Sequence, residues 1–186
     1  MNTKHILWIT QTAIFIALLV SVQAITRPFG QFVTGSCVNF ILVSSCIFLG
    51  LRSAVTVAIA SPIFAFMIIG IPVFPILIPF MMAGNFVIVA AIHLISGKSF
   101  ANLNRRSYIR ICVAAVTGSI LKFLVLWVGI VQIALSFIPG IRQPQIDAMA
   151  ATFSWPQLVT ALIGSSLAIA IMPNLSKALK FTERRS

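Results

Sequence analysis

The residues from Ile109 to Phe137, IRICVAAVTGSILKFLVLWVGIVQIALSF, decide the fold class of this chain. A helix that crosses a bilayer needs about 20 apolar residues, and this stretch is longer than that. Its only charged side chains are Arg110, near its start, and Lys122, near its middle. A helix with these properties is typical of a transmembrane span that tilts or protrudes. We therefore expect an integral membrane protein.

The composition of the whole chain supports the same conclusion. Of its 186 residues, 60% are hydrophobic and 8% are charged, whereas an ordinary soluble domain has about 25% charged residues. The mean hydropathy is +1.10. These values exclude a soluble protein, and we expect residues 1–186 to form a single transmembrane domain.

Five further apolar runs lie elsewhere in the chain. Together with the stretch at residues 109–137, they predict an all-α protein with six transmembrane helices. A short turn at Gly50-Leu51-Arg52 makes the second and third helices antiparallel. Links rich in proline precede the fourth and sixth helices, and Pro173 is expected to bend or end the last one. The predicted spans cover about residues 6–25, 32–49, 53–70, 76–95, 109–137 and 156–171.

The positive charges orient these spans. If the amino terminus is cytoplasmic, ten of the 13 Lys and Arg residues lie on the cytoplasmic side, and only Arg27 and Arg142 lie outside. Both termini are then cytoplasmic. The net charge of +11 and the pI of about 11.3 follow from this bias, and we expect no nucleic-acid partner.

The residues that catalysis requires are scarce. Asp147 and Glu183 are the only acids, and His5 and His93 are the only histidines. The three cysteines form no CxxC pair, so we expect no disulfide and no metal site. Because a nucleophile needs a base within hydrogen-bond reach, the sequence favours a protein that is not an enzyme and that has no cofactor.

Lys122 lies too deep in its span for its charge to reach water easily. No acid is available within the spans to pair with it. It is therefore neutral, solvated in a cavity, held by carbonyls and hydroxyls such as that of Ser119, or in contact with an anionic or carbonyl-bearing ligand. The alternative to a ligand or cavity role is a purely structural one.

Other polar and aromatic side chains gather toward the predicted outer half of the spans. Singly, each could hydrogen-bond or anchor a helix, but together with Lys122 they favour an outward-facing solute pocket. These candidate binding residues are Arg27, Asn39, Asn85, Trp127, Gln132, Gln157 and Thr160.

Ala13 and Ala17 place two small residues at four-residue spacing on the first helix. Such faces allow two helices to approach closely. The sixth helix has a comparable row at Ala161, Ser165 and Ile169, and most such rows serve internal packing. The pair on the first helix is a candidate contact for another protein.

Taken together, these features resemble the substrate-binding S component of an energy-coupling factor (ECF) type vitamin transporter. The resemblance covers essentially the whole chain and rests on the six spans and on four stretches. Ala13-Ile-Phe-Ile-Ala17 matches the AxxxA motif of that family. The other stretches are residues 34–39 (TGSCVN), 79–85 (PFMMAGN) and 154–160 (SWPQLVT).

The resemblance implies a protein of the bacterial plasma membrane that captures a vitamin or related micronutrient from outside. It implies binding by the outer parts of the last three helices and by the outer loops. The expected partners are a transmembrane T component, which would dock at Ala13 and Ala17, and two cytoplasmic ATPases. ATP hydrolysis by these partners would drive the S component to topple in the lipid bilayer and release its solute inward.

The identity of the solute is left open. Few charges lie at the outer side, which favours a largely neutral solute such as cobalamin. A carboxylate-bearing solute such as pantothenate would instead pair with Arg27, Arg142 or Lys122.

Two other classes of protein fit the composition. A secondary transporter or channel that works alone would have six spans as well, but we detect no inverted repeat and no buried coupling acid. A membrane scaffold is the second alternative, and it would bind no small solute.

Overall fold

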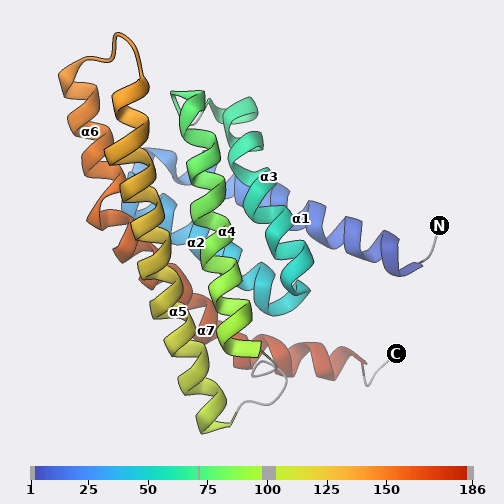
Figure 1. Ribbon diagram of the computed structural model, residues 1–186. Coiled ribbons are helices and arrows are strands. Elements are labelled where there is room, and N and C mark those ends of the chain that lie inside the picture. The colour runs from blue at the N-terminus through green and yellow to red at the C-terminus, as the bar shows by residue number, and fades with distance from the viewer. Residues whose placement is uncertain (1–2, 71, 98–103, 184–186) are drawn as a thin grey trace.

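The computed structural model describes residues 3–70, 72–97 and 104–183, and the chain is almost wholly helical there (Figure 1). Six helical stretches of this described part are long and apolar enough to cross a membrane, as the sequence predicts. The longer helices are α1 (Thr3–Thr26), α2 (Gln31–Leu49), α3 (Leu51–Ile69), α4 (Ile78–Ser96), α5 (Arg105–Leu126), α6 (Gln143–Phe153) and α7 (Trp155–Glu183).

Five helices form a closed ring in the order α2, α3, α4, α5 and α7, because α7 packs on both α5 and α2. The helix α1 packs on α2 and α3 from outside this ring, and its N-terminal part extends away from the bundle (Figure 1). Much of α1 is exposed as a result.

Two glycines make the turns at the ends of α3 possible. Gly50 joins α2 to α3 with φ of 81°, and Gly70 ends α3 with φ of 72°. The amide of Gly70 donates to the carbonyl oxygen of Phe66, which closes the helix. Residues other than glycine rarely adopt this backbone region, so these turns depend on the missing side chain.

The long fifth span is not a uniform α-helix. It continues from α5 into a π-helical segment, η4 (Trp127–Ile133), and then into a 3-10 segment, η5 (Ala134–Phe137). Gly129 within η4 lies against the ring of Phe80 on α4, where a side chain at position 129 would collide with it. The missing side chain of Gly129 thus lets Phe80 of α4 approach the fifth span closely.

The structure corrects one detail of the prediction and refines a second. The link before the last span contains the helix α6, which begins with Pro144 in its first turn and is capped by the side chain of Gln145 bonded to the amide of Arg142. The last helix does not end near Pro173 but continues to Glu183, and its C-terminal part runs at an angle to the rest, in agreement with the predicted bend (Figure 1).

Two of the three apolar clusters in the described bundle border the candidate site. The larger one lies among α1, α2, α3, α4, α5 and α7 and includes Leu42 and Ile88. The smaller one joins α5, η4 and α6 to the short helix η2 (Pro75–Leu77) and includes Leu126 and Ile130. The two clusters leave a space between them, and the candidate site lies there.

Candidate solute-binding site

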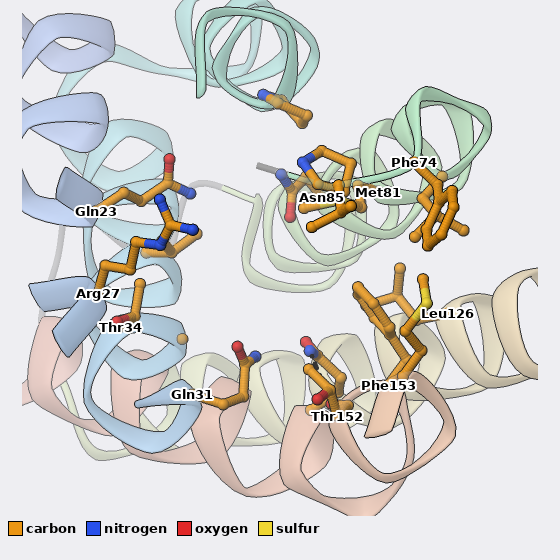
Figure 2. A pocket seen from close by; sticks show the side chains of 18 of the residues that line it. Gln23, Arg27, Gln31, Thr34, Phe74, Met81, Asn85, Leu126, Thr152 and Phe153 are labelled. Carbon is orange, nitrogen blue, oxygen red and sulfur yellow. Dashed lines mark hydrogen bonds between the residues drawn. The ribbon is translucent and has the colours of Figure 1, made fainter. Parts of the chain in front are cut away.

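A cavity of about 400 Å³ lies within the bundle and receives side chains from every long helix and from residues 72–74 (Figure 2). Val38 of the larger apolar cluster and Leu77 and Leu126 of the smaller one line it, so the cavity separates the two clusters. Its volume falls within the 300–1,000 Å³ range of small-molecule sites. The cavity is therefore large enough to hold a small organic solute.

Lys122 forms the polar centre of this cavity. Its Nζ donates to Oδ1 of Asn39 at 2.7 Å and to Oδ1 of Asn85 at 2.8 Å. The exposed fractions are 3% for Lys122, 1% for Asn39 and 6% for Asn85. Three residues that lie 83 and 37 positions apart along the chain thus form one buried cluster.

The two amides of this cluster are held in one orientation by backbone carbonyl groups. Nδ2 of Asn39 donates to the carbonyl oxygen of Gly35 at 2.8 Å, and Nδ2 of Asn85 donates to that of Ala58 at 3.4 Å. A carbonyl oxygen accepts only from a donor, so both amides must present Oδ1 to Lys122.

Pro62 in the middle of α3 explains why the carbonyl group of Ala58 is available. In an α-helix the carbonyl of residue 58 accepts from the amide of residue 62, and proline has no N–H. The side-chain amide of Asn85 supplies the missing donor across the helix interface. Pro62 thereby orients Asn85, and it also lines the cavity.

One wall of the cavity is polar and comes from α1, α2 and the short helix η1 (Arg27–Phe29). Figure 2 shows Gln23, Arg27 and Thr34 together on this side. Arg27 is exposed, and its guanidinium donates to the carbonyl oxygen of Ile69 at the end of α3 at 3.1 Å. Oε1 of Gln23 and Oγ1 of Thr34 are buried and have no hydrogen-bond partner among the described residues.

The opposite wall is apolar. Figure 2 shows Phe74, Met81, Leu126 and Phe153 facing this side of the cavity. They come from the link before α4, from α4, from α5 and from α6. Because α6 supplies part of this wall, the helix that the sequence did not predict helps to enclose the site.

Five of the eight predicted binding residues line the cavity. Four of them are Arg27, Asn39, Asn85 and Lys122. The fifth, Gln157 at the start of α7, is 5% exposed and donates from Nε2 to the carbonyl oxygen of Thr152 at 3.2 Å.

Three predicted binding residues lie outside the lining of this cavity. Trp127 and Gln132 lie on the exposed face of η4, and the ring of Trp127 stacks on that of Phe123. Thr160 is fully buried between α7 and α2, against Gly35, and donates to the carbonyl oxygen of Gln157. Its position is that of a packing residue. Among the described residues Lys122 donates to Asn39 and Asn85 and not to Ser119, whose hydroxyl donates to the carbonyl oxygen of Ala115.

Sequence reasoning missed several lining residues. Gln23, Gln31 and Thr34 are polar side chains at the junction of two apolar runs, and that pattern could have identified them. No comparable signal marks Phe74 and Phe153, because aromatic residues are common throughout the chain.

The two alanines of the predicted docking face, Ala13 and Ala17, are both exposed on α1. The large apolar side chains of Ile14 and Leu18 beside them are exposed as well. The small-residue row of α7 differs, since Ala161, Ser165 and Ile169 are buried.

No protein-family model, no curated protein and no solved structure matches this chain. A proposal for the function therefore depends on the geometry of the site itself.

Proposed function

We propose that this chain is the solute-capturing S component of an ECF-type importer for a vitamin or related micronutrient, in a bacterial plasma membrane. The observation that carries the proposal is the cavity of about 400 Å³ around the buried cluster of Lys122, Asn39 and Asn85. A charged or polar side chain buried in a membrane protein is costly and by default marks a functional site. Two polar atoms on the cavity wall, on Gln23 and Thr34, have no partner among the described residues and supply further hydrogen-bonding capacity for a solute.

The proposal assigns binding rather than catalysis to this site. Among the described residues, the cavity lining contains neither a carboxylate nor a histidine, and its lysine is engaged by two amides. Groups of this kind hold and orient a solute, whereas general acid or base catalysis requires a group that transfers a proton to or from the reacting atoms. Transport would then be powered by partners, namely a transmembrane T component and two cytoplasmic ATPases.

The exposed face of α1 around Ala13 and Ala17 is the proposed contact with the T component. Small side chains let a partner helix approach closely in lipid, where packing rather than the hydrophobic effect drives association. The helix α1 suits this role because it packs on only one side of the ring, against α2 and α3.

The volume of the cavity bears on the solute. Sites for drug-sized ligands measure about 300–1,000 Å³, and this cavity lies near the lower limit. Cobalamin, with its macrocycle and nucleotide tail, is much larger than a drug-sized ligand. The volume therefore favours a small vitamin over cobalamin, although the scarcity of outer charges had favoured the latter.

Native mass spectrometry of the purified protein tests this proposal, because it identifies a bound solute without a prior guess. We expect one small solute per chain. A matched pair of variants on α6 serves as control: Ala148 lines the cavity, and Ala151 is exposed and outside the lining. Ala148→Trp should abolish the bound mass and Ala151→Trp should retain it. A protein that binds no solute in any membrane extract, or equal binding by both variants, would contradict the proposal.

A further inference from the structure

The ammonium group of Lys122 has hydrogen-bonding capacity that the described residues do not use. A lysine ammonium carries three N–H donors, and two of them are directed at Asn39 and Asn85. Both partners are neutral amides, and their own N–H groups are bonded to backbone carbonyls. Lys122 also lines the cavity, so a solute bound there can accept from the remaining N–H.

The surroundings of Lys122 indicate which chemical group of a solute would pair with its ammonium. A buried cation without a counter-charge is unfavourable, and no carboxylate lines the cavity in the part of the chain that the structure describes. A solute carboxylate brings one negative charge, which matches the single ammonium. A phosphate monoester brings about −1.5 to −2 charges at pH 7. The other cation of the lining, Arg27, is exposed on the α1 wall and donates to the carbonyl oxygen of Ile69, so the second negative charge has no partner beside Lys122, which is 3% exposed.

The remaining walls indicate what is attached to that carboxylate. The unpaired Oε1 of Gln23 is an acceptor only, so it calls for an N–H or O–H donor on the solute. Phe74, Met81 and Phe153 offer an apolar surface on the other side (Figure 2). A solute that satisfies all three regions is a small organic acid with an apolar body and at least one further donor group.

Resting on the proposed function, we infer that the captured solute is such a monocarboxylic acid and that its carboxylate binds Nζ of Lys122 between Asn39 and Asn85. The neutral amide or alcohol analogue of the same solute can accept a hydrogen bond from the ammonium but brings no counter-charge. Loss of a charged hydrogen bond corresponds to roughly ten- to hundredfold weaker binding. The site therefore distinguishes a solute with a negative charge at one end from the neutral analogue of that solute.

Calorimetric titration with matched pairs tests this inference. The probes are pantothenate with pantothenol, nicotinate with nicotinamide and biotin with its amide, together with the solute that mass spectrometry identifies and its own neutral derivative. We expect the acid to bind at least about tenfold more tightly than its neutral counterpart. Equal or tighter binding of the neutral member, or a preference for a phosphate ester, would overturn the inference.

Two variants test whether the cluster of Lys122, Asn39 and Asn85 causes the preference for the acid over its neutral analogue. Lys122→Met removes the ammonium and should abolish the preference for the acid. Asn39→Asp is isosteric and places a carboxylate within reach of Nζ, so that the protein itself supplies the counter-charge and the solute acid is displaced. Asn39→Asp keeps the contact with Nζ of Lys122 and gives up only the bond from Nδ2 to the carbonyl oxygen of Gly35, so it remains informative if Lys122→Met fails to fold.

The matched control is Asn104→Asp, which makes the same chemical change at the N-cap of α5, where its side chain accepts from the amide of Ser107. Aspartate caps a helix as well as asparagine does, so we expect unchanged binding. If a solute binds to the wild type but Asn39→Asp leaves the acid preference intact, the inference is wrong and the capture function stands. If the wild type binds no solute, the proposed function fails as well.

Discussion

Pro62 influences the candidate site because it has no N–H and therefore cannot make the usual backbone hydrogen bond within α3. Its missing N–H leaves the carbonyl of Ala58 to the side chain of Asn85, which then presents its oxygen to Lys122. The residue thus connects the backbone of α3 to the polar centre of the cavity.

Pro62→Ala should weaken solute binding while leaving the fold at least as stable. The new amide at position 62 donates to Ala58 within the helix, so Asn85 loses its fixed partner. We expect about three- to tenfold weaker binding, the equivalent of one modest hydrogen bond, together with an unchanged or higher melting temperature. Titration calorimetry and thermal unfolding measure the two effects.

Pro144→Ala, at the exposed start of α6, should change neither the solute affinity nor the melting temperature. Undiminished binding by Pro62→Ala would show that Asn85 is oriented by other contacts.

The sequence identifies the members of the buried cluster but not their contact. Lys122, Asn39 and Asn85 are each conspicuous as polar residues within apolar runs, and all three were predicted to bind solute. Their hydrogen bonds join α2, α4 and α5, and the rotation of each helix about its axis depends on packing across the whole bundle. Thr160 lies against Gly35 and outside the cavity lining, and spacing along α7 cannot show this for the same reason.

At the scale of elements, the contact of α2 with α7 depends on a glycine. A Cβ added at Gly164 would lie 2.5 Å from the carbonyl oxygen of Ser36 and 2.7 Å from Cβ of Asn39. Both distances are far below van der Waals contact, and the backbone of α2 cannot rotate away as a side chain can.

Gly164→Ala should therefore push α7 away from α2 and disturb Asn39. We expect a loss of about 1–3 kcal/mol in the free energy of unfolding, the usual range for overpacking, and weaker solute binding. Unfolding in detergent, followed by circular dichroism, measures the first effect. Gly118→Ala is the control, because its added Cβ would lie 3.3 Å from Ile88 and requires only a small adjustment. A variant Gly164→Ala as stable as the wild type would refute this account of the interface.

The exposed face of α1 gives a second prediction at this scale. Ala13→Trp and Ala17→Trp should leave solute binding unchanged and should reduce ATP-dependent uptake by a reconstituted transporter to background, because a large ring prevents close approach of a partner helix. Val113→Trp, on an exposed position of α5, is a control that should retain both properties. Normal uptake by the two alanine variants would remove α1 as the docking face.

The element that the sequence failed to predict is α6. With 11 residues it is too short to cross a bilayer, and its flanking prolines and glycine are typical of a loop. Its fold depends on apolar contacts of Ile146, Met149 and Phe153 with η4 and η2, which lie elsewhere in the chain. The first-turn proline was the one local signal of a helix start.

At the scale of the whole molecule, the apolar runs alone predict the number of spans, because each must satisfy its backbone hydrogen bonds internally in lipid. The closure of five helices into a ring and the position of the cavity between two apolar clusters are properties of the packed bundle. The proposal that follows is that this bundle holds a solute, and that the energy for its release comes from other chains.

Proteoliposomes that contain only this protein and an excess of radiolabelled solute, the one that native mass spectrometry identifies, provide the most direct test of that claim. We predict saturable binding that approaches one solute per chain, with no accumulation or exchange across the bilayer until the T component, the ATPases and ATP are supplied. Solute flux through the isolated protein, at a rate that is unaffected by ATP and by the partner subunits, would contradict the account and identify a self-sufficient transporter or channel.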